Sequence, residues 1–275
     1  MTLYGVDISN WQAGISISEI AAEGFSWVEA KVSEGDYLQD PTWLGFLASA
    51  QAIDLPIIGY HYAMADCAPA AQVRTWLAGN GGANAMIDFE GGGGAIGDFW
   101  ALVQAFNDAG VNVVLSYLPQ WYWEQIGSPD LSQVPGLVAL AYPDGSGDAC
   151  DLYAAAGGDS GEGWTPYGNA QPLIWQFSNQ ASVAGMSVDA NAFRGDIDEL
   201  TALIGDDMTP QQAQQLQDIW DQLRGPNGQG WPQLGHNSEG HNLTPVDALA
   251  GLITTVNGLA ADVQTLKGAT THEPR

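Results

Sequence analysis

Two carboxylates stand two residues apart at the end of one apolar stretch of the chain. Asp88 and Glu90 close the segment 86–90, and four glycines follow at 91–94. In an extended strand, side chains at positions i and i+2 point to the same face, so the two acids are expected side by side. Two like charges at close range resist ionising together, which raises the pKa of one of them. A carboxylic acid beside a carboxylate can carry out general acid catalysis on an acetal or an ester.

Further acidic and aromatic residues, and one glutamine, stand at or near the ends of other apolar segments. They are, in chain order, Asp7, Glu34, Tyr60, Tyr117, Trp121, Trp175, Gln176 and Asp189. If these segments are parallel strands of a barrel, their carboxyl ends meet at the face where such barrels carry their function. Aromatic planes beside carboxylates suit a sugar, because its C–H faces stack on the rings while its hydroxyls take hydrogen bonds. The pattern predicts a carbohydrate site, although Asp7 taken alone would equally fit a loop cap.

Residues 1–205 alternate apolar segments with helical ones. The expected strands are 3–8, 27–32, 56–62, 85–90, 111–117, 137–142 and 173–177, and the expected helices lie near 18–23, 41–52, 70–78, 97–109 and 120–126. Continuous apolar strands separated by helices predict a parallel sheet covered on both faces, in the α/β class. A TIM-like (β/α) barrel is favoured over an open doubly wound sheet, because no glycine-rich dinucleotide turn follows the first strand. Residues 143–163, rich in Gly, Asp and Ser, are expected to form a surface loop rather than a calcium loop.

The charge balance excludes several classes of partner. The chain has 6 basic and 32 acidic residues, a formal net charge of −26, so nucleic acid and anionic membranes are not expected partners. The four histidines lack metal-ligand spacing, and no metal site is expected. We expect no signal peptide and no apolar run long enough to cross a bilayer. Cys67 and Cys150 either form one disulfide or remain two buried thiols.

Six short motifs lie in order along the first two hundred residues. They read GVDISNWQ at 5–12, AKVSEG at 30–35 with DP at 40–41, YHY at 60–62, IDFE at 87–90, WQF at 175–177 and VDAN at 188–191. In this order and approximate spacing they resemble glycoside hydrolase family 25, the lysozymes (N-acetylmuramidases) common in phage endolysins. The resemblance implies an irregular barrel of five βα units followed by antiparallel strands. It also implies hydrolysis of the β-1,4 bond between N-acetylmuramic acid and N-acetylglucosamine in peptidoglycan.

The resemblance implies roles for single residues as well. Glu90 matches the general acid, Asp88 the acid beside it, Asp7 the acid on the first strand and Asp189 the late aspartate on the pocket wall. Substrate contacts are expected, without a cofactor, from Tyr60, Tyr117, Trp121, Trp175, Gln176 and Asn191. The family looks most similar to enzymes assisted by the substrate's 2-acetamido group, whereas a close or wide carboxylate pair would indicate a retaining or an inverting course. Residues 137–171 match the family poorly, which leaves one wall of the cleft undefined.

A separate region follows residue 205. We expect a barrel at 1–205, a helix and Gly/Pro-rich linker at 206–241, and a coiled-coil helix and tail at 242–275. The last helix begins at Thr244-Pro245 and carries apolar residues at alternating spacings of three and four, the heptad pattern of a short coiled coil. These residues are Leu249, Leu252, Val256, Leu259, Val263 and Leu266. They predict a homo-oligomer, dimer or trimer, although a single helix packed on the barrel would show similar spacing.

Two functions remain in view. The first is a phage-encoded peptidoglycan muramidase that is carried on the virion tail or released to the host cell wall. The alternative is a non-catalytic structural or wall-binding component of the tail tip, built on the same barrel. Both readings include other phage tail proteins as partners, and a virion-borne muramidase would satisfy both.

Overall fold

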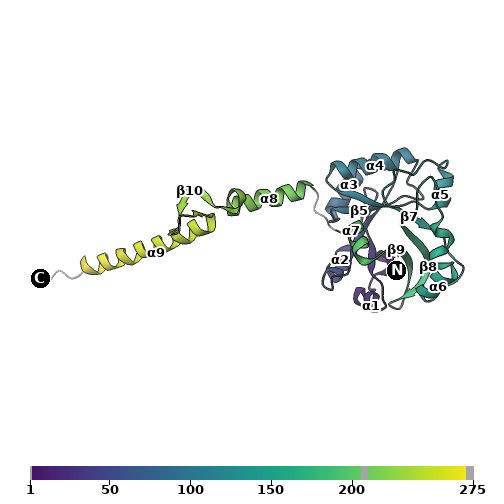
Figure 1. Ribbon diagram of the computed structural model, residues 1–275, viewed down its shortest axis with the longest axis horizontal. Coiled ribbons are helices and arrows are strands. Elements are labelled where there is room, and N and C mark those ends of the chain that lie inside the picture. The colour runs from purple at the N-terminus through teal and green to yellow at the C-terminus, as the bar shows by residue number, and fades with distance from the viewer. Residues whose placement is uncertain (1, 206–209, 271–275) are drawn as a thin grey trace. The chain divides into compact units, whose positions relative to one another are not determined.

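The computed structural model describes residues 2–205 and 210–270. The chain divides into two compact units, Met1–Thr209 and Pro210–Arg275, whose elements are labelled in Figure 1. Both cysteines are free, so the disulfide alternative does not apply. Neither thiol is fully buried, since Cys67 is half-buried and Cys150 is exposed.

Eight strands of the first unit close into a barrel. They are β1 (Thr2–Ile8), β2 (Trp27–Glu34), β4 (Ile57–Tyr62), β5 (Asn84–Asp88), β6 (Asn112–Tyr117), β7 (Leu137–Leu140), β8 (Ile174–Val183) and β9 (Met186–Arg194). Neighbours from β1 through β2 and β4 to β8 are parallel, whereas β9 is antiparallel to both β8 and β1. A short strand, β3 (Leu38–Gln39), pairs with β2 outside the closed ring. The predicted irregular (β/α) barrel is confirmed.

The antiparallel end of the barrel is made by one long hairpin. Strands β8 and β9 are joined at Ala184 and Gly185, which both have positive φ, the combination that a tight hairpin turn requires. The apolar segments of the sequence predicted only the first residues of β8, at 173–177, and did not predict β9. From Met186 to Ala192, β9 alternates apolar and polar residues instead of forming an apolar run, a sequence pattern that is typical of an antiparallel strand.

Seven helices belong to this unit. They are α1 (Ile17–Ala22), α2 (Trp43–Gln51), α3 (Pro69–Ala78), α4 (Ile96–Asp108), α5 (Gln120–Gln125), α6 (Ala149–Ala155) and α7 (Ile197–Ile204) among the described residues, with 3-10 turns η1 (Asn10–Gln12), η2 (Gly158–Ser160) and η3 (Glu162–Trp164). The first five lie where the sequence predicted helices. The prediction of a plain loop at 143–163 is wrong, because α6 forms there with Asp148 as its N-cap. This capped helix of seven residues docks through three buried residues, Ala149, Leu152 and Tyr153.

Two apolar layers follow from strand alternation. One lies between strands and helices and contains Trp76, Phe99 and Phe106. The other fills the barrel itself with side chains of successive strands and of α7: Trp27, Ile58, Met86, Leu115, Val138, Ile174, Phe193, Leu200 and Ile204. Strand β9 ends at Arg194, opposite Thr2 at the start of β1, so α7 closes the amino end of the barrel. Polar side chains of the interior face therefore collect at the carboxyl end.

The second unit contains two helices and a hairpin. Helix α8 (Pro210–Arg224) leads through the turn η4 (Pro226–Gly228) to β10 (Trp231–His236), β11 (Asn242–Leu243) and α9 (Pro245–Thr270). The expected Gly/Pro-rich linker thus contains a paired hairpin, which packs on α9. Thr244 and Asp247 cap α9 reciprocally, each accepting from the other's backbone N–H.

Helix α9 also corrects one expectation. Over Pro245–Lys267 it is long and apolar enough to cross a membrane by length and composition, whereas the sequence reading found no such run. The reading missed it because Asp247 and Asp262 interrupt the run near its two ends.

His61 on β4 is held neutral in the layer beneath the helices. The amide of Gln72 donates to the carbonyls of Met64 and Cys67, so its Oε1 accepts from Nε2–H of His61 at 2.9 Å. The other ring nitrogen, Nδ1, then accepts from the Ser33 hydroxyl at 2.8 Å. Burial lowers the pKa of His61 from 6.5 to about 4. His61 is therefore a hydrogen-bonded core residue.

This burial predicts a pH dependence of stability. The pKa of His61 is depressed on folding, so its contribution is complete above pH 6.5 and is lost as the pH falls toward 4. The loss amounts to at most about 3 kcal/mol. Urea unfolding at pH 7.5 and pH 5 should show a smaller pH-dependent loss for His61→Gln than for the wild type. The control is His236→Gln, at an exposed position, which should lose as much stability between pH 7.5 and pH 5 as the wild type. An equal loss in His61→Gln and His236→Gln would contradict the burial of a neutral His61.

Candidate active site

Three carboxylates form a row across neighbouring strands inside the barrel. Asp7 on β1 is the register partner of Glu29 on β2 and of Asp189 on β9. Register partners point to the same side of a sheet, and this side is the interior, because Trp27 and Phe193 on the same faces belong to the barrel core. Glu29 is 1% exposed. The sequence reading missed Glu29, although an acid between Val28 and Ala30 in an apolar run was the available signal.

Burial and mutual repulsion keep protons on this row. Burial is the main cause that raises the pKa of Asp7 well above its usual range, and the charges of Asp189 and Glu29 raise it further. A hydrogen bond from Tyr60 acts in the opposite direction on Asp7. Burial, followed by the charge of Glu90, raises the pKa of Asp189 to about 6.

Asp88 and Glu90 flank the end of β5. The strand ends at Asp88, so Glu90 belongs to the following loop. The sequence had predicted a strand that included Glu90. Phe89 between them points outward and packs on Phe99 and Tyr122. Burial, then the Glu90 charge, raises the pKa of Asp88 well above normal, and burial also raises that of Glu90. The two acids thus face the interior and influence each other electrostatically, as their spacing predicted.

Gln176 connects the row to the tyrosines. Its Oε1 accepts hydrogen bonds from the hydroxyls of Tyr117, at 3.0 Å, and of Tyr142. With Oε1 fixed as the acceptor, the amide nitrogen faces Asp7 at 3.5 Å and Asp189 at 3.4 Å. The structure therefore brings Tyr117 and Gln176 to the predicted acids.

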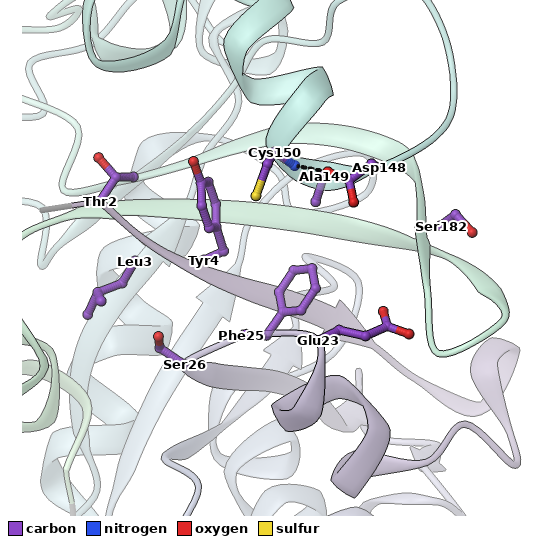
Figure 2. A pocket seen from close by; sticks show the side chains of 11 residues that line it. Thr2, Leu3, Tyr4, Glu23, Phe25, Ser26, Asp148, Ala149, Cys150 and Ser182 are labelled. Carbon is purple, nitrogen blue, oxygen red and sulfur yellow. Dashed lines mark hydrogen bonds between the residues drawn. The ribbon is translucent and has the colours of Figure 1, made fainter.

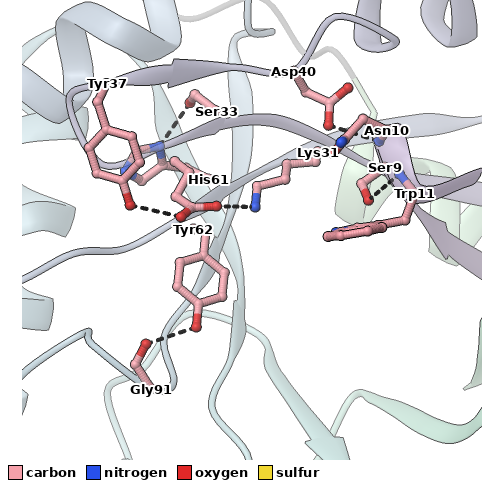
Figure 3. Close-up of polar contacts among 11 residues, drawn as sticks. Ser9, Asn10, Trp11, Lys31, Ser33, Tyr37, Asp40, His61, Tyr62 and Gly91 are labelled. Carbon is pink, nitrogen blue, oxygen red and sulfur yellow. Dashed lines mark hydrogen bonds and ion pairs between the residues drawn. The ribbon is translucent and has the colours of Figure 1, made fainter. Parts of the chain in front are cut away.

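One ammonium group lies beside the acids. Lys31 forms an ion pair with Glu34, and its ammonium nitrogen lies 4.9 Å from the centre of the Tyr62 ring. Figure 3 shows the side chains of Lys31 and Tyr62. Glu34 also accepts from the hydroxyl of Tyr37 at 2.7 Å. The Lys31 charge lowers the pKa of both Asp88 and Glu90, against the larger effect of burial.

The loop acids of the motifs have structural partners. Asp40 accepts from the backbone N–H groups of Asn10 and Thr42, each at 2.9 Å, and so ties the loop after β1 to the loop before α2. The glycines after Glu90 serve a turn, because Gly92 and Gly94 have φ of +100° and +90°, values that other residues rarely adopt.

The structure does not bring every predicted aromatic residue to the site. Trp175 is 1% exposed and packs in the outer layer against Trp164, on the face of β8 opposite Gln176. Trp121 on α5 is 46% exposed, and Trp11, which the sequence reading left without a role, is 86% exposed just after β1. Asn191 is fully buried in the barrel, and neither atom of its amide has a hydrogen-bond partner among the described residues.

Two hollows lie outside the acid row. One of about 210 Å³ is lined by Gln120, Tyr142, Glu162 and Tyr167, beside the carboxyl end of β7. Another of about 520 Å³ lies where the start of β1 meets the end of α1 and the start of α6, and Figure 2 shows Tyr4, Phe25 and Cys150 lining it. None of the predicted catalytic or binding residues lines this second hollow. In the described part of the chain, no group of three or more His, Cys, Asp or Glu side chains is arranged to hold a metal ion.

Comparison with known families agrees with this geometry. Residues 6–186 match Glycosyl hydrolases family 25. The chain belongs to this family. Residues 208–261 of this family 25 chain match a second family, the Rv3766 C-terminal domain. Glu29 and three of the predicted catalytic acids, Asp7, Asp88 and Glu90, lie within the first match. The fourth, Asp189, lies three residues beyond its end.

Solved structures share the barrel of the family 25 chain. A lysozyme from Streptomyces coelicolor superimposes with a TM-score of 0.60 at 21% identity, covering 74% of this chain and 96% of that one. A family 25 lysozyme from Aspergillus fumigatus gives the same TM-score and identity over 74% and 99%. The catalytic domain of an endolysin from a bacteriophage of Listeria monocytogenes gives 0.56 at 20% identity over 74% and 98%. At these identities the likeness shows the fold.

One relative has a higher sequence identity to this chain than these solved structures have. Protein Rv3766 of Mycobacterium tuberculosis, which is uncharacterized, is 36% identical over 135 residues. The match covers 47% of the family 25 chain and 42% of the relative, so the chain spans less than half of that protein's length.

The Gln176 network of the family 25 barrel predicts a stability effect. In Gln176→Met the hydroxyls of Tyr117 and Tyr142 lose their acceptor inside the barrel, which should cost about 1–3 kcal/mol. Urea unfolding measures the loss. Gln180→Met, at an exposed position of the same strand, is the control and should change stability by less than about 0.5 kcal/mol. Equal effects of the two substitutions would show that the network does not stabilise the barrel.

Proposed function

We propose that this chain is a peptidoglycan muramidase. It hydrolyses the β-1,4 bond between N-acetylmuramic acid and N-acetylglucosamine. The observation that carries the proposal is the gathering of Asp7, Asp88, Glu90 and Asp189 at one end of a family 25 barrel. Buried like charges hold protons near neutral pH, and a protonated carboxyl is what glycosidic cleavage requires.

Two catalytic roles are proposed for the four acids, one for Glu90 and one for an aspartate. Glu90 donates its proton to the glycosidic oxygen as the bond from that oxygen to C1 breaks. The carbonyl oxygen of the substrate's 2-acetamido group forms a bond to C1, and Asp88, Asp7 or Asp189 in ionised form orients that group. Water then attacks C1 as the bond from C1 to the acetamido oxygen breaks, which restores the 2-acetamido group. The water gives its proton to Glu90, which returns the acid to its starting state. The half-buried position of Glu90, in the loop beyond β5, supports its contact with solvent and substrate.

The substrate contacts follow from exposure and position. Tyr60, Tyr117 and Gln176 line the interior beside the acids. Asn191 is fully buried and pairs with Gly5 on the amino-end side of the acids, so it is not proposed as a direct contact. Trp121 offers an exposed ring on α5, next to Gln120 of the hollow at β7, which suits a sugar face. Trp175 is not proposed as a contact, because it is buried in the outer layer.

Glu90→Gln tests the assignment directly. We expect it to reduce the release of reducing ends from purified peptidoglycan by about 10²-fold or more, because the amide cannot donate the catalytic proton. Glu124→Gln, an exposed glutamate on α5, is the matched control and should retain wild-type activity. Borohydride reduction of the products should yield muramicitol. Glucosaminitol instead would mean a different bond specificity, and equal activity of the two variants would remove Glu90 as the acid.

We propose further that α9 joins copies of this chain. Its apolar positions 249, 252, 256, 259 and 263 are each about half exposed or more within their own unit, which leaves a continuous heptad seam uncovered. The uncharged run between Asp247 and Asp262 has fourteen residues, a helix of about 21 Å, shorter than the roughly 30 Å of a bilayer core. The run length and the net charge of −26 favour self-association over membrane insertion.

Self-association supports a place on a multisubunit particle. We propose a phage-encoded enzyme carried on the virion tail, with the barrel at 1–205, a connecting region at 206–241 and the oligomerising helix and tail at 242–275. The fold likeness to a phage endolysin is compatible with this origin. A non-catalytic tail component remains the alternative if wild-type protein binds wall without cleaving it.

The seam predicts the oligomeric state. Light scattering of the full chain should give a dimer or trimer, and Leu252→Asp with Leu259→Asp should give a monomer. The control places the same two charges on the opposite face of the helix, Thr254→Asp with Ala261→Asp, and should leave the oligomer intact. A monomeric wild type would contradict the proposal, as would flotation of the wild type with phosphatidylcholine–phosphatidylglycerol vesicles.

A further inference from the structure

Glu29 is the acid of the row that the proposed mechanism does not use. It lies deeper than the other carboxylates, being 1% exposed, and it stands beside Asp7 across the β1–β2 pairing. Its Oε2 is buried and has no hydrogen-bond partner among the described residues. A carboxyl in this position is costly to bury. An apolar residue would fill the barrel at lower cost.

The neighbouring residues hold this carboxyl in one place. The indole of Trp27, also fully buried, donates from Nε1 to Oε1 of Glu29 at 3.0 Å. The ring reaches this position across Gly5 on β1, where a Cβ would lie only 2.1 Å from the ring atom Cε2. The absence of a side chain at Gly5 therefore makes room for the indole that fixes Glu29.

The titratable groups around Glu29 come from three other strands. Asp7 on β1 and Asp189 on β9 complete the row, and Tyr60 of β4 hydrogen bonds to Asp7. On its own strand, Lys31 is engaged with Glu34. Burial, followed by the Asp189 charge, raises the pKa of Glu29 to about 7, against the lowering effect of the Trp27 hydrogen bond. Glu29 thus changes its charge near neutral pH, directly beside two acids of the proposed reaction.

We propose that Glu29 is a positioning residue that acts through Asp7 and Asp189. By carrying or losing one negative charge in the same row, it sets how firmly the acid cluster keeps its protons, and so the pH range over which the barrel cleaves peptidoglycan. This inference rests on the proposed muramidase function. Glu29 itself does not contact the glycan, because it is only 1% exposed.

The substitution Glu29→Gln isolates the charge. The amide keeps an oxygen for Trp27 and nearly the same volume, but it never ionises. Loss of a negative charge lowers the pKa of the carboxyls that face it, so the cluster releases its remaining protons at lower pH. We expect the basic limb of the pH–rate profile, measured as initial rate at low peptidoglycan concentration, to move to lower pH by about one unit.

Two further variants separate this role from a purely structural one. Glu29→Asp keeps the charge and should keep the basic limb near its wild-type position, even if the rate falls. Glu124→Gln removes a surface charge and should not move the limb. A uniform loss of rate at every pH in Glu29→Gln, with the limb in its wild-type place, would overturn the proposal.

A second measurement does not depend on activity. Because the pKa of Glu29 is raised on folding, its contribution to stability is complete below its unfolded value and is lost as the pH rises through about 7. The urea midpoint of Glu29→Gln relative to wild type should therefore rise between pH 4.5 and pH 7.5. A constant difference would show that Glu29 does not titrate in the fold. If wild type cleaves nothing at any pH, the proposed function fails, while this comparison still decides whether Glu29 is the titrating member of the row.

Discussion

The burial of like charges is the constraint on which this barrel depends. Five carboxyls face one another at its carboxyl end: Asp7, Glu29, Asp88, Glu90 and Asp189. The ammonium of Lys31 is the positive charge that lowers pKa values there, and it is shared with Glu34. Such a group cannot ionise fully at low dielectric, so the cluster retains protons at a pH where isolated carboxyls have lost them. The acidity that glycosidic cleavage needs is thus a property of the set rather than of one residue.

The rest of the interior is arranged to make this set tolerable. Neutral donors face the carboxyls: the hydroxyl of Tyr60, the amide of Gln176 and the indole of Trp27. Gln176 is itself held by two tyrosine hydroxyls, and the indole of Trp27 lies against Gly5. Donors without charge stabilise a carboxylate less than a cation would, so they hold the geometry without removing the protons.

The sequence predicted the repeated apolar strands of the barrel and missed the elements that depart from this repeat. The apolar segments located seven strands, because continuous burial on both faces leaves a clear signal. Strand β9 and helix α6 were not predicted, because β9 alternates apolar and polar residues and α6 has only seven residues within a segment rich in Gly, Asp and Ser. At the site, the motifs identified Asp7, Asp88 and Asp189 as residues that share one interior. They could not show which face Trp175 takes, because it and Gln176 are neighbours on a strand whose two faces are both buried. Glu29 lay outside every motif, and only its register opposite Asp7 gives it meaning.

The closure of the barrel by α7 has a consequence for how the acids exchange protons with solvent. Leu200 and Ile204 fill the amino end together with Trp27 and Phe193, so protons reach the row from the carboxyl end, where the substrate would also bind. A glycan chain lying across that end would separate the cluster from bulk water for as long as it stayed. The number of protons in the cluster would then be fixed at the moment of binding, and each turnover would begin with the charge state that solution pH had set before the encounter.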